Sequence, residues 1–207
     1  MGQVGCFPQA NQFSIIQEPS HKLRYRETGK FHMMQDVSAN GAVTTLTVNL
    51  LYCLPFVLDR KVRITAAGFR ITTGVAGGLL YWAIYDNIPD KVFPRNILLQ
   101  DSVSGATANT NRISNFDRTF EPGLYWFVEG SNKAISTIYV DTNNQILISG
   151  WNEFVLGGSP GAAVRGYTIA LADITLGLPD PFPIAATPDT ARNSWPQGAL
   201  FFDSYPA

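Results

Sequence analysis

The stretch that most constrains the fold of this chain is 121–128, with the sequence EPGLYWFV. Proline at 122 sets the first torsion of a two-residue turn, and we expect glycine at 123 to supply a positive φ there. The uncharged aromatic and branched residues that follow favour a strand, and the next chain breaker, Gly130, comes too soon for a helix. We therefore predict a strand in the middle of a sheet, with apolar side chains on both of its faces.

The length of 207 residues suffices for one sizeable all-β domain with an extension, or for two small domains. At this size roughly 70% of the unfolded surface can be buried, so the core needs no disulfide or metal. Charged residues are scarce, at 15% of the chain, while 18 glycines and 13 prolines indicate many turns. The net charge of −1 argues against nucleic-acid binding, because phosphate recognition needs a basic surface.

The two cysteines, Cys6 and Cys53, lie far apart in the sequence. We expect both to be small reduced hydrophobes, and a disulfide between the N-terminal arm and the domain is the alternative. Residues 1–10 lack the basic-then-apolar pattern of a signal peptide, and no apolar run approaches the ~20 residues of a membrane span. We therefore expect a protein with no membrane partner that folds in the cytosol where it is made.

The first 41 residues follow neither the helical nor the strand period, and we predict an N-terminal arm over 1–41. A basic cluster at 21–30 carries four formal positive charges against one negative. One interpretation is a solvated arm with a few docked side chains. We favour an extended arm that grips a neighbouring subunit through its charges. The predicted contacts are Lys22, Arg24, Arg26 and Lys30.

From residue 42 onward the apolar pattern changes to period two. In 44–52 every second residue faces one side, which predicts a strand with one buried face that Pro55 ends. In 61–71 the apolar positions change parity. Because a one-residue slip would place them on the wrong face, we predict a bulge near Ala67 and Gly68.

Further strands are predicted at 79–85, 96–100, 113–120, 124–129, 134–140, 145–150 and 166–172, with a hairpin turn at 141–144. About nine short strands with regularly spaced turn signals and no helical period are typical of an antiparallel sandwich. We predict an all-β fold over 42–177, a jelly-roll-like antiparallel β-sandwich. Residues 178–207 begin with a proline-rich run that is unsuited to a sheet, and we expect an irregular C-terminal tail.

Four stretches of the sequence carry a resemblance to a known family. The stretch 52–56 (YCLPF) has the form Tyr-x-x-Pro-Phe, and 68–87 is a small-residue loop followed by an Ala-Ile-Tyr-Asp strand end. Leu98-Leu99 followed by 120–127, and the exit 178–183 (LPDPFP), complete the set. Taken in order, these stretches resemble a β-sandwich domain of virion proteins in tailed bacteriophages. The resemblance covers about residues 43–185. The loop after Asp86 departs from it, because the family's usual Pro-Gly pair is replaced, so the role of that loop does not carry over.

Such domains are similar to parts of tail fibres, head spikes and capsid decoration proteins, so the resemblance implies a virion component that is assembled in the host cytoplasm. We favour a capsid decoration (cement) protein. It would be a homotrimer that bridges the major capsid protein or other virion proteins through its arm and tail. The alternative is a tail-fibre or receptor-binding subunit that holds host glycans on the sandwich loops.

The sequence offers little that is typical of catalysis or metal binding. His21 and His32 lack zinc-site spacing and lie in the arm, away from any nucleophile on the sandwich. The acidic residues are expected on loops and strand ends, without the pairing that a glycosidase needs. They are Asp86, Asp90, Asp101, Asp117, Glu121 and Glu129. We expect no enzyme activity and no cofactor.

The tryptophans divide into two groups. Trp82 and Trp126 lie in the middle of predicted strands and are predicted to be core residues, whereas Trp151 and Trp195 are candidates for partial exposure. Aromatic rings are enriched at subunit interfaces. The predicted contacts in the tail are Trp195, Phe201, Phe202 and Tyr205.

Overall fold

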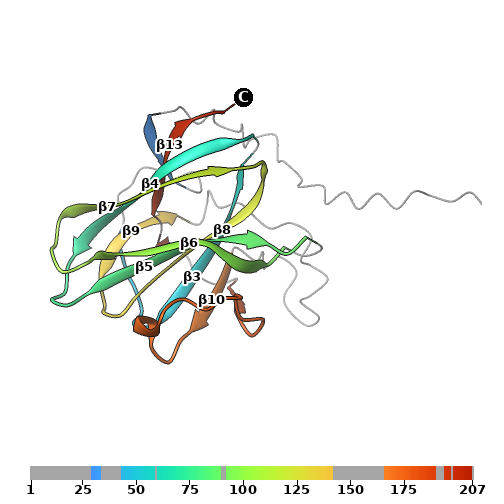
Figure 1. Cartoon of the computed structure of the whole chain (residues 1–207). Helices are drawn as coiled ribbons and strands as arrows, with labels where there is room; N and C mark the ends of the chain where they lie inside the picture. The colour runs from blue at the N-terminus through green and yellow to red at the C-terminus, as the bar shows by residue number, and fades with distance from the viewer. Residues whose placement is uncertain are drawn as a thin grey trace, which may run out of the picture.

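The computed structural model describes residues 29–33, 43–58, 60–89, 92–141, 166–189, 194–196 and 198–206. These residues form two antiparallel sheets packed face to face, which confirms the predicted all-β sandwich (Figure 1). The strands are β1 Lys30–Met33, β2 Val43–Thr45, β3 Leu50–Leu58, β4 Val62–Thr73, β5 Leu79–Asn87, β6 Pro94–Ser104, β7 Thr110–Phe120, β8 Gly123–Ser131, β9 Ser136–Asp141, β10 Gly166–Ala170, β11 Thr187–Asp189, β12 Ser194–Pro196 and β13 Ala199–Ser204.

The first sheet has the order β1-β13-β4-β9-β12, with β2 paired to β9 and β7 paired to β4. The second has the order β11-β10-β3-β8-β5-β6. Strand β8, which contains the LYWFV stretch, lies between β3 and β5, as predicted for a central strand. The positive φ expected at Gly123 is wrong, because the described glycines with positive φ are Gly29, Gly77 and Gly177. Gly123 already pairs with Leu58 as the first residue of its strand.

Two predictions about strand irregularities have different outcomes. The change of parity in β4 is real: its register with β7 shifts between Ile64 and Ala66, slightly before the predicted position. The predicted break at Pro55 is wrong, because β3 continues to Leu58. Strand β10 pairs with residues 50–53 of β3, so Pro55 lies beyond the part of β3 that has neighbours on both sides within the described residues. A proline that lacks a backbone donor is tolerated at such a position.

The second sheet is apolar on both faces, and each face belongs to a separate core. Phe127 and Trp82 point inward to the core between the sheets. Trp126, Tyr85 and Cys53 point outward to a second core. Both tryptophans are fully buried, as predicted, and Cys53 is a buried free thiol. Cys6 lies outside the described residues.

Residues 171–186, which we call the covering segment, close the second core. Figure 1 shows the segment in orange, beyond the second sheet on the side away from the first sheet. Its buried residues recur at every fourth position: Ile174, Leu178, Phe182 and Ala186. The segment contains one short 3-10 helix, η3 (Ile174–Leu176), and a cis peptide bond between Asp180 and Pro181. It is therefore part of the folded domain, although it forms no strand.

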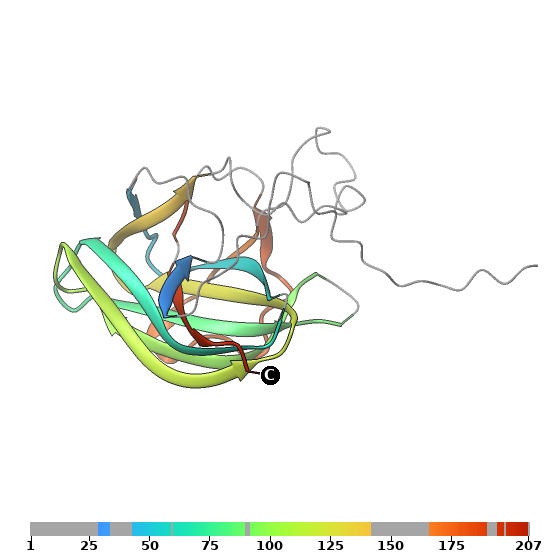
Figure 2. The same ribbon diagram turned by 90° about the horizontal axis from the view of Figure 1, so that it is seen from above.

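The tail is less irregular than expected. Strand β13 lies inside the first sheet between β1 and β4, and Figure 2 shows β1 (blue) beside β13 (red). The expectation of an irregular segment is wrong at Ala199–Ser204, because Leu200 and Phe202 are buried in the core at alternate positions of a strand. The predicted strand at 145–150, its hairpin turn and Trp151 lie outside the described residues.

Candidate functional site

The covering segment carries the two most exposed large apolar side chains of the described residues. Leu176 is 86% exposed and Ile184 is 89% exposed, against 54% for Ile113, the next highest. Leu176 ends η3, and Ile184 lies between the buried Phe182 and Ala186. Isolated exposed apolar residues are ordinary on protein surfaces. These two are of interest because hydrogen bonds to the second sheet hold the segment that carries them at residues 171–174 and 179–182.

Two sets of hydrogen bonds, which we call fastenings, hold the covering segment. The first is made by Asn49, which precedes β3. Its φ is 59°, a left-handed conformation that asparagine tolerates better than most residues. Its backbone oxygen accepts a hydrogen bond from the Leu171 N–H at 2.8 Å. Its side-chain oxygen accepts one from the Ile174 N–H at 3.3 Å, and its Nδ2 donates to the Ala172 oxygen at 3.2 Å. One residue therefore satisfies three backbone groups at the start of the covering segment.

The η3 turn is capped from within the segment. The Asp173 carboxylate accepts hydrogen bonds from the Thr175 hydroxyl at 2.7 Å and from the Thr175 N–H at 2.8 Å. These bonds hold the pKa of Asp173 below its usual value. The cap fixes the turn that presents Leu176.

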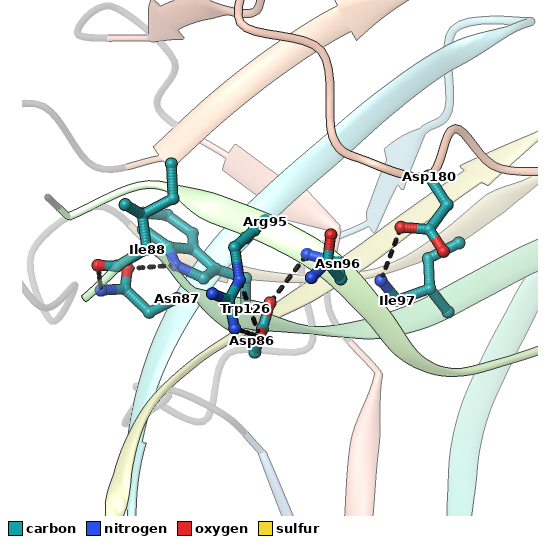
Figure 3. Close-up of polar contacts among 8 residues, drawn as sticks. All are labelled: Asp86, Asn87, Ile88, Arg95, Asn96, Ile97, Trp126 and Asp180. Carbon is teal, nitrogen blue, oxygen red and sulfur yellow. Dashed lines mark hydrogen bonds and ion pairs between the residues drawn. The ribbon is translucent and has the colours of Figure 1, made fainter. Parts of the chain in front are cut away.

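The second fastening lies at the ends of β5 and β6 (Figure 3). The Asp180 Oδ1 accepts a hydrogen bond from the Ile97 N–H at 3.2 Å, and the Arg95 backbone oxygen accepts one from the Phe182 N–H at 2.7 Å. The buried Tyr85 hydroxyl donates to the Pro179 oxygen at 2.6 Å. Residues 179–182 are thus tied to both strands.

The strand ends themselves are held by Asp86 and Asn87. Asp86 pairs with the Arg95 guanidinium and accepts a hydrogen bond from the Asn96 N–H at 2.7 Å. The pairing raises the pKa of Arg95. The Asn87 Oδ1 accepts from the Trp126 Nε1–H at 2.9 Å, as Figure 3 shows. With Asp86 paired in this way, the cluster positions the backbone and offers no free acid or base.

A second charged cluster lies on the outward side of the first sheet. Arg63 on β4 donates to both oxygens of Asp117 on β7, at 2.8 and 2.7 Å, and to Asp203 on β13 at 2.7 Å. The hydrogen bond from Arg63 holds the pKa of Asp117 down. The cluster links three strands at the surface.

Of the described acidic residues, Glu129 alone is buried. It was expected near a strand end, but it lies within β8 and is 1% exposed. Neither of its carboxyl oxygens has a hydrogen-bond partner in the described structure. Burial raises the pKa of Glu129 to about 8, and the backbone N–H of Gly198 acts in the opposite direction. This carboxyl is therefore mainly protonated at neutral pH.

The predicted arm contacts are only partly within the described chain. Lys22, Arg24 and Arg26 lie outside it. Lys30 begins β1, where its backbone pairs with that of Phe202. The structure thus brings one predicted arm residue beside one predicted tail residue.

The predicted tail contacts occupy different environments. Trp195 lies in β12, opposite Val140. Phe201 is half-buried on β13, and Phe202 is 1% exposed in the inter-sheet core, where a partner at the surface would not reach it. Tyr205 is half-buried, with the Arg60 guanidinium 5.2 Å from its ring centre.

The sequence prediction missed Leu176, Ile184 and Asn49. A hydrophobic pattern does not distinguish Leu176 from its buried neighbour Ile174, since both are branched aliphatic residues in a short turn. Glu129 could have been found: with Phe127 pointing inward, the alternation along a strand places residue 129 inward as well.

The described residues contain no group of three or more His, Cys, Asp or Glu side chains placed to hold a metal ion. Within the same ranges, no helix is long and apolar enough to cross a membrane.

Comparison with known proteins yields little. No family model matches the chain, and no curated protein matches it. Among solved structures, a chain in the structure of infectious bursal disease virus Gt strain is similar at 12% sequence identity and a TM-score of 0.25. The match covers 85% of this chain and 40% of the viral chain, so this chain spans less than half the length of that protein. A TM-score this low does not establish a common fold.

Proposed function

We propose that the protein is a structural component of a virus particle, and specifically a decoration (cement) protein on the shell of a tailed phage. The sequence motifs that resemble phage virion domains support this, because three of them fall on neighbouring strands. Residues 52–56 lie in β3, 83–86 in β5 and 124–127 in β8, and these strands are adjacent in the second sheet. The fourth, 178–183, lies in the covering segment over the same sheet.

The observation that carries the proposal is the presentation of Leu176 and Ile184 on a fastened segment. An apolar side chain that is already held in place loses little conformational entropy on binding, so its burial contributes more to affinity. Burial of apolar surface is worth about 25 cal/mol per Å². A coat protein is a partner of suitable chemistry, since it offers many identical copies of one surface.

The mechanism is stabilisation by burial at many sites. Each copy would bridge coat subunits through the covering segment, and the basic residues Lys22, Arg24, Arg26 and Lys30 would add contacts to a neighbouring subunit. Linked copies in a homotrimer would attach with an avidity well above that of one site. In this role the protein needs no catalytic activity and no cofactor.

The test is attachment to capsid shells of the virus whose genome encodes the chain, measured by co-sedimentation. The double variant Leu176→Ser/Ile184→Ser is expected to attach at least tenfold more weakly than wild type. Ile113→Ser is the matched control, because Ile113 is also exposed but lies on β7. Stability should change by no more than about 0.5 kcal/mol in either case. Equal attachment of all three proteins would refute the role of the covering segment.

The arm is tested separately by deletion of residues 1–28, which leaves β1 and its pairing with β13 in place. We expect weaker attachment and unchanged folding. Attachment of the shortened protein at full strength would exclude residues 1–28, with Lys22, Arg24 and Arg26, as an anchor.

The second candidate is a receptor-binding subunit that recognises host glycans. The outward side of β7 favours it, because Asn111, Asn115 and Thr119 are exposed on either side of Ile113. Amide and hydroxyl groups beside an apolar residue suit sugar binding. Binding to host surface polysaccharide without attachment to shells would favour this function over the first.

A further inference from the structure

Glu129 lies in the core between the two sheets, at the centre of the second sheet. Its backbone pairs with Tyr52 on β3 and with Trp82 on β5, and Trp82 pairs in turn with Asp101 on β6. Directly paired residues of neighbouring strands point to the same face. Tyr52, Glu129 and Trp82 therefore form a buried inward-facing row.

The group that approaches Glu129 from outside its own sheet is the backbone of Gly198, immediately before β13. The fit there is tight. A Cβ on Gly198 would lie 2.6 Å from Cε1 of Phe69 and 2.8 Å from Cζ of Phe127. The backbone at the entry of β13 is therefore packed tightly against these two rings and lies beside the carboxyl of Glu129.

Among the residues that the structure describes, no neighbouring charge compensates an ionised Glu129. The ionisable side chains on the inward faces around it are Tyr52 on β3, Asp101 on β6, and Arg112 and Arg118 on β7. Asp101 accepts a hydrogen bond from Ser114, and Arg118 donates to the Leu98 oxygen. On β4 and β13, Arg63 and Asp203 pair on the outward side. The pKa of Glu129 is set by burial and by the Gly198 N–H, not by any of these charges.

We propose that Glu129 is a proton-operated latch on β13: the strand closes over the protonated carboxyl, and loss of the proton to solvent favours release of the strand from Gly198 onward. A buried carboxylate that has only the Gly198 N–H beside it is strongly disfavoured, whereas the neutral acid is tolerated. Release of β13 exposes the carboxylate to water. This device is independent of the proposed virion role.

We expect β13, and not β8, to separate from its neighbouring strands. Glu129 itself is fixed, because β8 pairs along its length with β3 on one side and β5 on the other. The pairing of β13 with β4 is interrupted by two register shifts, between Phe201 and Phe202 and between Phe202 and Ser204. A strand with an interrupted ladder opens at lower cost than a continuous central strand.

The direction of the pH effect follows from linkage. Burial raises the pKa of Glu129 to about 8 in the closed state, from 4.5 when the residue is exposed. Between these values the open state holds fewer protons than the closed state, so opening becomes more favourable as the pH rises. The ratio of open to closed molecules should rise about tenfold per pH unit from about pH 4.5 to about pH 8 and then level off.

The test is amide hydrogen exchange on the full chain from pH 5 to pH 9, expressed as protection factors for β13 and β8. In wild type we expect β13 to be less protected than β8, and to lose protection about tenfold per pH unit up to about pH 8. In Glu129→Gln the protection of β13 should not change with pH, since the amide cannot ionise. Glu121→Gln, at an exposed site before β8, is the control and should behave as wild type.

Three results would overturn the latch. The protection of β13 could be independent of pH in wild type, it could equal that of β8 at every pH, or its pH dependence could persist in Glu129→Gln. The second result would mean that the strand opens only in global unfolding. If Glu129→Gln does not fold, the wild-type comparison of β13 with β8 still decides. The carboxylic C=O infrared band then serves as an additional test, since it must be present at pH 6 and lose about half of its intensity by about pH 8.

Discussion

Asn49 holds Ile174 in the second core from a distance of 125 residues along the chain, through a hydrogen bond of 3.3 Å from the Ile174 N–H to the Asn49 side-chain oxygen. The same side chain binds the Ala172 oxygen. This contact joins the start of β3 to the covering segment, so the stability of the second core and the position of Leu176 depend on one polar residue.

Replacement of Asn49 should loosen the covering segment. Asn49→Ala removes both side-chain hydrogen bonds and places a less tolerant residue at positive φ, and we expect a loss of about 2–4 kcal/mol in the free energy of unfolding. Asn109→Ala is the matched control. Asn109 also has a positive φ, 52°, but it is exposed and its side chain holds no other segment, so only the backbone strain of about 1–2 kcal/mol applies. Urea denaturation measures both, and equal losses would contradict the role of Asn49.

The other fastening can be tested through Tyr85. Tyr85→Phe removes the hydroxyl that donates to the Pro179 oxygen at 2.6 Å and leaves that oxygen without this donor. We expect a loss of about 1–2 kcal/mol and faster proteolysis within 178–183. Tyr125→Phe removes a comparable bond of 2.8 Å to the Glu121 oxygen, but at an exposed site where water can replace it. A larger loss from Tyr125→Phe would argue against the fastening.

The parts of the fold that could be predicted from sequence are those with a strict pattern. The LYWFV stretch has no polar residue, so a central strand with two buried faces was the consistent interpretation, and the parity change in 61–71 required an irregularity in β4. Strand β13 was not predicted because Phe201 and Phe202 are adjacent aromatic residues. The sequence therefore shows no alternation of apolar and polar positions there, although Phe201 is half-buried and Phe202 is buried. The break predicted at Pro55 was wrong because the effect of this proline depends on how far β10 extends along β3, which is a property of the sheet and not of the local sequence.

The candidate surface could not be predicted for a different reason. In 171–186 the buried residues recur at every fourth position, but the segment forms no regular helix beyond the short η3. The exposure of an aliphatic residue there depends on a turn and on two distant fastenings. Leu176 and Leu178 are two positions apart in the chain, but one is exposed and the other is buried. The contacts that hold the segment come from Asn49, Tyr85 and Ile97, and no sequence spacing relates these residues to the segment.

The surface cluster around Arg63 should respond to acid. Hydrogen bonding to Arg63 holds the pKa of Asp117 below its unfolded value of about 3.9. The group therefore contributes stability above about pH 4, and this contribution is lost as the pH falls through the lowered pKa. Asp117→Asn should have a slightly lower melting temperature than wild type at pH 6, and the difference should disappear by about pH 2. A difference between the two proteins that is unchanged at pH 2 would contradict this prediction.

Gly198 should not tolerate a side chain. An alanine Cβ there would lie 2.6 Å from Cε1 of Phe69 and 2.8 Å from Cζ of Phe127, and both rings belong to the packed core. Overpacking of this kind costs roughly 1–3 kcal/mol, so Gly198→Ala should lower the free energy of unfolding by that amount. Gly123→Ala is the control, because its Cβ would meet Tyr125 at an ordinary 3.5 Å. If the entry of β13 is as closely packed as the distances indicate, thermal denaturation will separate the two variants, and an unchanged Gly198→Ala protein would show that β13 has room to move without opening.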